Sequence, residues 1–285
     1  MLLLLVFVGC KKIIVFDIDS KVPTLVVNAF ISNDSLFNFT LSTSQSVISS
    51  AIRNKVSNAT IEVFDKDSNL VTTIIEQGIG IYQSSFARAK PNTLYRYKIN
   101  ALGKVYAINE ATPDSIQIEI KDTSRGVFKG RNKVFITKLK LTDRSILGNY
   151  FSLKIKKTFL NKVTNTTQEE WCDLETLDFI LTEDPKSKFS KKNLLFTDRY
   201  FNNQSTWLNI GCVGLFDNPN QTAQRLDIYA STISSSAFQF LTSLNENLFF
   251  QNDPFSQSPQ LFGNLPNAHG AIYSQTMQKL AVNFL

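Results

Sequence analysis

The sequence predicts an all-β protein, with an immunoglobulin/fibronectin-like sandwich at the N-terminus and a larger β-rich domain that carries one helix near the C-terminus. Short segments of alternating apolar and polar residues recur, separated by turn signals at the roughly 8–12-residue spacing of a β-sandwich. One helical periodicity stands out, close to the C-terminus. The length of 285 residues fits two domains. We expect the sandwich at residues 23–112 and the second domain at residues 113–285.

Composition excludes several classes of protein and of site. Apolar residues make up 43% of the chain and charged residues 19%, which is enough for real cores and excludes global disorder. The net charge of +6 is spread along the chain without a concentrated basic stripe, so nucleic acid is not an expected partner. One His and three Cys are too few for a His-rich metal site or a thiolate zinc cluster. We expect neither a metal nor a cofactor.

The chain begins with an apolar run, residues 1–9, followed by Cys10. The run is too short to span a bilayer and fits the apolar region of a signal peptide. Gly9 and Cys10 resemble the end of a bacterial lipobox, where a peptidase cleaves before a Cys that then carries a diacylglyceryl group. We expect a signal peptide at residues 1–9 and a lipidated tether at residues 10–22. The alternatives are a leader cleaved elsewhere and a buried strand that ends in an ordinary Cys.

The predicted sandwich consists of short strands joined by turns. Its strand-like segments are residues 24–31, 37–42, 60–64, 70–75, 91–99 and 103–107, with a further strand that opens at Gly80. The stretch Pro91-x-Thr93-x-Tyr95-x-Tyr97 resembles the corner before a late strand in fibronectin type III and related domains, where a Tyr hydroxyl bonds back to the chain. An ordinary aromatic strand is the alternative. Pro113 then ends the last strand, because proline has no N–H to donate.

The second domain is predicted to be β-rich with one amphipathic helix. Strand patterns lie at residues 115–120, 134–141, 150–159, 213–216, 226–229 and 279–284, and residues 161–192 form a long polar excursion. Three lysines of this domain are expected to point mostly into solvent: Lys154, Lys156 and Lys157. The helix is predicted over residues 234–250, with the N-cap hydroxyl supplied from the serines at 234–236. Its core-facing apolar residues, at spacings of 4, 3 and 4, are Ala237, Leu241, Leu244 and Leu248.

Three patterns suggest chemistry, and each has a simpler interpretation. The positions from Asp65 to Glu76 match a calcium loop, but Leu70 stands where its invariant Gly belongs, so we favour a hairpin turn. Acidic residues gather around Trp171: Glu169, Glu170, Asp173, Glu175 and Asp178. Such carboxylates could pair for hydrolysis, whereas a solvated loop is the favoured interpretation. The single His269 has no Gly-x-Ser-x-Gly nucleophile beside it in the sequence and is expected to be structural or exposed.

Two cysteines, Cys172 and Cys212, remain once Cys10 is lipidated. A pair of cysteines in an exported chain suggests a disulfide. Two free buried thiols are the alternative interpretation, and the sequence leaves both open.

Aromatic residues near the end of the helix suggest a place where a partner docks. Phe249 ends the helix and Phe255 follows in a polar loop that contains proline. Aromatic anchors inside a polar rim are typical of protein interfaces, so we predict both residues to be partner-binding. The alternative is that they pin the C-terminal loop onto the sandwich.

Three stretches of the sequence carry a resemblance to a known family. They are residues 143–151, residues 195–203, and a C-terminal stretch that runs from Phe240-Leu241-x-x-Leu244 through residues 252–259 to residues 264–273. Together with the lipobox and the sandwich-like first region, they resemble the uncharacterised domain-of-unknown-function lipoproteins of Bacteroidota. That resemblance implies an outer-membrane lipid anchor and a gene beside a TonB-dependent receptor. Asn264 and Tyr273, in the most specific stretch, are added to the predicted partner-binding residues.

Two departures from the family pattern limit what the resemblance implies. Ala268-His269-Gly270 stands where members usually carry Gly-Leu-Gly. Lys11 and Lys12 follow Cys10, where surface-exported lipoproteins tend to be acidic, so the resemblance leaves open whether the chain faces the periplasm or the cell surface. We therefore expect a non-enzymatic outer-membrane lipoprotein that is an accessory or binding partner of a TonB-dependent receptor. A cell-envelope hydrolase that uses the acidic loop near Trp171, or an adhesin-like module, are the alternatives.

Overall fold

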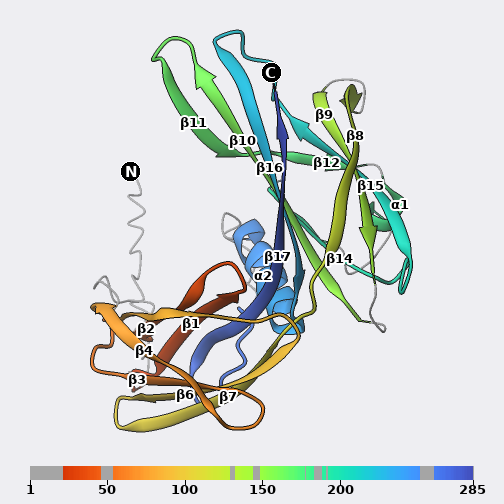
Figure 1. Ribbon diagram of the computed structural model, residues 1–285. Coiled ribbons are helices and arrows are strands. Elements are labelled where there is room, and N and C mark those ends of the chain that lie inside the picture. Colours follow the sequence, from red (N-terminus) through yellow and green to blue (C-terminus); the bar gives the residue numbers. More distant parts are fainter. Residues whose placement is uncertain are drawn as a thin grey trace, which may run out of the picture.

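The computed structural model describes residues 22–45, 54–128, 132–143, 148–176, 178–182, 188–190, 192–250 and 260–284. The fold is nearly all β with one long helix near the C-terminus, as the sequence predicts. Figure 1 shows two β-bodies, one above the other, with the long helix beside the strand that joins them. The predicted signal peptide, Cys10, the tether up to residue 21 and Phe255 lie outside the described residues.

The first body is the predicted sandwich. Its strands are β1 (Leu25–Ser32), β2 (Leu36–Thr43), β3 (Thr60–Phe64), β4 (Leu70–Gly78), β5 (Ile81–Arg88), β6 (Thr93–Ala101) and β7 (Lys104–Thr112). Neighbouring strands run in the order β1-β2-β5-β4-β3-β6-β7, and every pair is antiparallel. In β1, Val27 and Ala29 are buried whereas Asn28 and Phe30 are exposed, which is the period of two that the sequence shows. All seven strands contribute side chains to one core.

The predicted aromatic corner is confirmed at Tyr95. Its side chain is buried, and its hydroxyl accepts a hydrogen bond from the backbone N–H of Lys90 at 2.9 Å. The ring packs edge-on against Phe37 of β2, with ring centroids 5.5 Å apart. Tyr95 therefore ties the connection between β5 and β6 to the core of the first body.

The second body is a second pair of sheets around its own core. Its elements are β8 (Gln117–Phe128), β9 (Asn132–Thr142), β10 (Tyr150–Asn161), β11 (Thr166–Trp171), β12 (Leu174–Thr176), α1 (Phe179–Thr182), β13 (Lys188–Ser190), β14 (Asn193–Thr197), β15 (Ser205–Val213), β16 (Gln221–Ile233) and part of β17 (His269–Asn283). One sheet runs β13-β14-β10-β16-β17, with β11 paired to β10, and the other runs β12-β15-β9-β8. The predicted polar excursion thus contains three short strands and α1.

A disulfide joins Cys172 and Cys212, whose Cα atoms are 5.5 Å apart. Cys172 follows β11 directly, and its backbone N–H bonds the carbonyl of Ile155 in β10. Cys212 lies in β15 of the facing sheet. The bond therefore links the two sheets of the second body, and both cysteines belong to the buried core between them.

The long strand β17 belongs to both bodies. Residues from His269 to Gln275 pair in parallel with β1, and residues from Gln275 to Asn283 pair antiparallel with β16. The buried side chain of Ile272 accordingly lies in the core of the first body. The predicted boundary at Thr112 coincides with the end of β7, but the last strand crosses back over it. Strand pairing is set by the tertiary fold, so no local signal in the sequence marks this return.

The predicted helix is α2 (Ser235–Phe250), and its N-cap is Ser234. The hydroxyl of Ser234 accepts a hydrogen bond from the backbone N–H of Ala237 at 3.1 Å. The helix packs through its first turns, where Ala237 and Phe238 are buried. The prediction that Leu248 faces the core is wrong, because its side chain is 54% exposed. Within the described residues, no helix combines the length and the apolar composition that crossing a bilayer requires.

Candidate functional site

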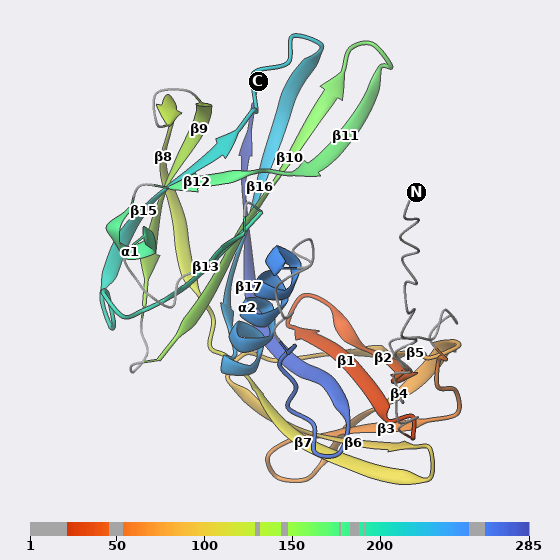
Figure 2. The same cartoon turned by 180° about the vertical axis from the view of Figure 1, so that it is seen from behind.

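A cavity of about 900 Å³ lies where α2 approaches the outer face of the first body. Figures 1 and 2 show α2 from opposite sides, beside β17 and close to β1. Strands β1, β2 and β17, helix α2 and the segment from residue 260 to residue 268 all contribute to its lining. The lining residues that matter for chemistry are Asn28, Ser42, Phe240, Gln260, His269 and Tyr273.

Parallel pairing of β1 with β17 builds one wall of the cavity. Val26 pairs with His269 and Phe30 with Tyr273. Between them, Gly270 has a φ of +86°, and a Cβ atom there would lie 2.0 Å from the carbonyl oxygen of Val27. Only glycine allows the two strands to approach so closely in this conformation. Gly270 therefore sets the geometry of the wall.

Aromatic rings line the side of the cavity next to α2. The ring of Tyr273 stacks on Phe240 of α2 with centroids 4.6 Å apart, and it also contacts Phe30 at 5.1 Å. Burial raises the pKa of the Tyr273 hydroxyl to about 12, so the phenol stays neutral at physiological pH. That hydroxyl has no hydrogen-bond partner among the described residues. Tyr273, predicted as partner-binding, thus combines a fixed ring with an uncommitted polar atom.

The polar part of the lining is uncharged. It comes from amide, hydroxyl and imidazole side chains, and the described lining residues include no Asp, Glu, Lys or Arg. The carboxamide of Asn28 projects from the exposed face of β1. Neither Asn28 nor Phe240 is among the predicted partner-binding residues, although Phe240 belongs to the stretch that carries the family resemblance and the alternation of β1 places Asn28 on the outer face. The alternating pattern of β1 does not predict that α2 and β17 lie against its outer face.

Asn264, another predicted partner-binding residue, is not among the described lining residues of this cavity. The carboxamide of Asn264 donates to the carbonyl of Ile272 at 2.7 Å and accepts from its N–H at 3.0 Å, so it fastens the preceding loop to β17. The N–H of Phe262 donates to the Ser243 hydroxyl at 3.0 Å, which fastens the same loop to α2. The side chain of Phe249, like Phe255, lies outside the described residues.

Two of the acidic residues around Trp171 are paired with lysines of β10. Glu169 pairs with Lys156 at 2.5 Å, and Glu170 pairs with Lys157 at 3.0 Å. Consecutive residues of a strand point to opposite faces, so these two carboxylates do not converge on one substrate. The prediction that Lys157 points into solvent is wrong, because it is only 8% exposed. Its ion pair with Glu170 makes that burial tolerable.

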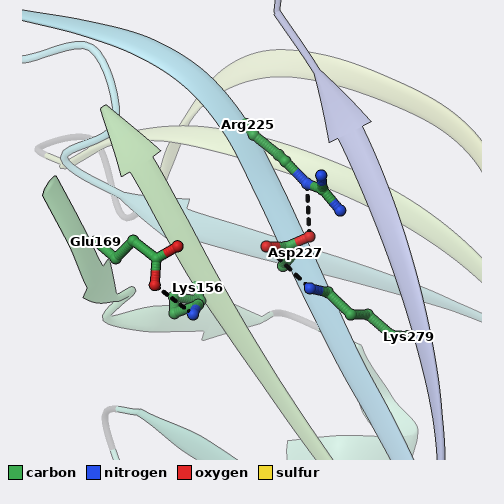
Figure 3. A network of polar contacts seen from close by, with 5 residues as sticks. All are labelled: Lys156, Glu169, Arg225, Asp227 and Lys279. Carbon is green, nitrogen blue, oxygen red and sulfur yellow. Dashed lines mark hydrogen bonds and ion pairs between the residues drawn. The ribbon is translucent and has the colours of Figure 1, made fainter. Parts of the chain in front are cut away.

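A second group of ion pairs lies nearby on the same sheet (Figure 3). Asp227 of β16 accepts from Arg225 at 2.7 Å and pairs with Lys279 of β17 at 3.3 Å. The hydrogen bond to Glu169 raises the pKa of Lys156, whereas burial lowers the pKa of Lys154. These charges stabilise contacts between neighbouring strands of the second body.

The calcium-like pattern forms the hairpin turn that the sequence favours. The carboxylate of Asp65 accepts hydrogen bonds from the side-chain amide of Asn69 at 3.1 Å and from the N–H groups of Asn69 and Asp67, both at 2.9 Å, and these bonds lower its pKa. Glu76 instead accepts from the N–H of Asn58 at 2.9 Å. The first and last positions of the pattern therefore serve different turns.

Comparisons with known proteins identify a family and no activity. A family model described as "Domain of unknown function (DUF4249)" matches residues 11–279. No curated protein matches the chain significantly in sequence. Among solved structures, the Yersinia pseudotuberculosis adhesin InvE is 13% identical over 74% of this chain and 55% of that chain, with a TM-score of 0.20. A Salmonella alpha-2-macroglobulin mutant is 9% identical over 91% of this chain and 14% of that chain, with a TM-score of 0.23.

Proposed function

We propose that this chain, which belongs to the DUF4249 family of domains of unknown function, is a non-enzymatic lipoprotein anchored to the outer membrane through Cys10. It serves as an accessory binding partner of a TonB-dependent receptor and uses no cofactor. The apolar leader before Cys10 supports the anchor. The resemblance of the C-terminal stretch to lipoproteins encoded beside such receptors supports the partner.

The uncharged cavity beside α2 is the observation that carries the binding role. Concave sites lined by aromatic rings and a few convergent polar groups are where proteins bind ligands. Here the ring of Tyr273 is held between Phe30 and Phe240, and its hydroxyl has no partner among the described residues. Such pre-positioned groups lose little conformational freedom on binding.

The chemistry of the lining selects an uncharged segment of the receptor as the occupant. Peptide N–H and C=O groups match the amide side chains of Asn28 and Gln260, and apolar side chains match Phe240 and Leu261. A charged side chain is disfavoured, because the described lining offers it no counter-charge and burying an unpaired charge is costly.

Two asparagines on adjacent strands provide a matched test. Asn28 of β1 and Asn38 of β2 are both exposed on the outer face, but only Asn28 lines the cavity. Asn28→Lys places a charge inside the cavity and should reduce receptor recovered with the affinity-tagged protein by at least about tenfold. Asn38→Lys adds the same charge outside it and should leave recovery unchanged. Melting temperatures of both variants verify folding.

The outcomes separate the parts of the proposal. Equal recovery with both variants contradicts the role of the cavity, and recovery of no receptor by the unmodified protein contradicts the partnership. Cys10→Ser should abolish palmitate incorporation and release the protein from membranes. A protein that incorporates no palmitate and fractionates like the Cys10→Ser variant contradicts the anchor.

A further inference from the structure

We propose that one end of the first body, which we call the tether end, inserts its exposed apolar side chains into the lipid surface that holds the anchor. The tether end comprises Val22, the β4–β5 turn at Ile79 and the β6–β7 turn with Leu102 and Val105. The inference rests on the proposed lipid anchor at Cys10 and adds a second membrane contact to it.

The strand directions place these segments at the same end of the sandwich. Every neighbouring pair in the order β1-β2-β5-β4-β3-β6-β7 is antiparallel. Strand β1 therefore begins at the end where β4 turns into β5 and where β6 turns into β7. A shared hollow lined by Val22, Leu102 and Lys104 confirms that the chain emerges beside the β6–β7 turn.

Exposed apolar side chains occur at both ends of the first body, with Phe86 near the opposite end, and four of them lie at the tether end. Val22 is 84% exposed, Ile79 69%, Val105 62% and Leu102 51%. Single exposed apolar residues are ordinary on protein surfaces, but several at the tips of adjacent turns form a patch that marks an interaction site.

The conformation of Leu102 is the second observation. Leu102 and Gly103 occupy the centre of the two-residue β6–β7 turn with φ angles of +52° and +71°. Such turns favour Asn-Gly, because a bulky side chain is strained at positive φ. A leucine there is unfavourable for the folded chain in water. Strained residues of this kind cluster at functional sites, so an exposed leucine at the tip of this turn points to contact with another surface.

Two exposed lysines at the tether end suit contact with a lipid surface. The exposed lysines Lys55 and Lys104 flank the apolar tips, and lysines attract anionic headgroups. Nearby Glu76 accepts hydrogen bonds from the N–H groups of Asn58 and Gly80. The turns at the opposite end carry both signs of charge: Asp34, Asp65, Asp67, Lys66 and Lys90.

The length of the tether is compatible with this contact. Eleven residues separate Cys10 from Val22, so the anchored sulfur lies at most about 40 Å from the tether end when the chain is fully extended. When the tether is less than fully extended, the exposed apolar side chains of the tether end can reach the lipid headgroups. Lipid chains and an amphipathic protein surface then act together as two signals for membrane attachment.

A tethered-vesicle experiment isolates this contact from lipidation in cells. The chain from Cys10 to its C-terminus is coupled through the Cys10 thiol to maleimide lipid, since the other two cysteines form a disulfide. The vesicles contain phosphatidylcholine and phosphatidylglycerol with brominated acyl chains, which quench indole emission on contact. Val105→Trp is compared with Leu94→Trp, which changes an exposed residue of the same hairpin at the opposite end.

Brominated lipid should quench the added indole of Val105→Trp at least twofold more than that of Leu94→Trp. The native emission of Trp171 and Trp207 is subtracted with the parent protein. Adding Ile79→Ser and Leu102→Ser to Val105→Trp should abolish the difference, with melting temperatures confirming that each variant folds. Equal quenching at both positions, or no quenching at either, overturns the inference.

Outcomes in cells then separate this inference from the proposed function. Quenching on vesicles together with a failure of Cys10 to incorporate palmitate in cells supports the lipid contact and contradicts the anchor. Palmitate incorporation without quenching supports the anchor and overturns the contact. Protection of the tether end by added receptor alone, without lipid, also overturns it, because the occupant is then a protein.

Discussion

The two halves of β17 present different kinds of surface on the same face of the sheet. Tyr273 and Lys279 are six residues apart and point to the same side, because side chains alternate along a strand. Tyr273 lies between the rings of Phe30 and Phe240, whereas Lys279 pairs with Asp227. One strand thus carries an uncharged aromatic surface in the first body and a charged surface in the second.

The difference between the two halves of β17 indicates which surface has polar groups available to bind a ligand. In the second body, Asp227 is paired with both Arg225 and Lys279, and Lys156 with Glu169 (Figure 3). A ligand must break or share those bonds, so it gains little there. In the first body, the Tyr273 hydroxyl has no partner among the described residues. The contrast favours binding at the first body and a supporting role for the second.

Opening the disulfide should give the largest change, and it should fall on the second body. Cys172→Ser releases a loop whose ends are 40 residues apart, which lowers the free energy of unfolding by roughly 4 kcal/mol in the chain-entropy model. Urea unfolding followed by fluorescence measures it, because both tryptophans, Trp171 and Trp207, lie in this body. Cys10→Ser is the control. An unchanged midpoint for Cys172→Ser contradicts a stabilising role for the bond.

Gly270→Ala should weaken the first body by about 1–3 kcal/mol, because the new Cβ meets the Val27 carbonyl and the positive φ is strained. It also tests whether the parallel contact between β1 and β17 holds the cavity together. Gly78→Ala is the matched control, since a Cβ there has no atom within 4 Å. Thermal unfolding measures both variants. Equal melting temperatures would contradict the close strand approach.

Tyr95→Phe should cost about 1 kcal/mol, since it removes the hydrogen bond from the Lys90 N–H at the corner of the first body. Tyr97→Phe is an internal control, because the buried Tyr97 hydroxyl has no partner among the described residues. Its removal should be neutral or stabilising. Denaturant unfolding of the two variants gives the comparison. If Tyr97→Phe lowers the free energy of unfolding more than Tyr95→Phe does, the stabilising hydrogen bond is wrongly assigned to the Tyr95 hydroxyl.

Glu110 should give the smallest effect, at the junction of the two bodies. Its buried carboxylate accepts from the hydroxyls of Ser236 and Ser274, and burial raises its pKa above the ordinary 4.5. The folded protein therefore binds this proton more tightly than the unfolded chain, and stability falls as pH rises above about 4.5. Glu110→Gln should flatten that fall in melting temperature between acidic and neutral pH. If melting temperature depends on pH in the same way in the unmodified protein and in Glu110→Gln, the proposed link between Glu110 protonation and stability is contradicted.

The sequence by itself determined the features that depend on near neighbours. The alternation in β1 predicted its buried face, the serines at 234–236 predicted the start of α2, and the aromatic stretch predicted that a Tyr hydroxyl bonds back to the chain, as Tyr95 does. Each rests on interactions within a few residues, so residue type and spacing suffice to predict it. Local pattern failed at Leu248 and Lys157, where packing against other elements decided exposure.

Only the tertiary structure decided how the chain's two ends meet. Val26 pairs with His269 near the opposite end of the chain, and Phe240 reaches the same wall from α2. A strand offers its edge to any partner of compatible register, so sequence spacing does not reveal which segment will lie beside it. The cavity exists because three distant segments converge on the outer face of the first body. Residue types gave the chemistry of its lining, and long-range pairing brought that chemistry together.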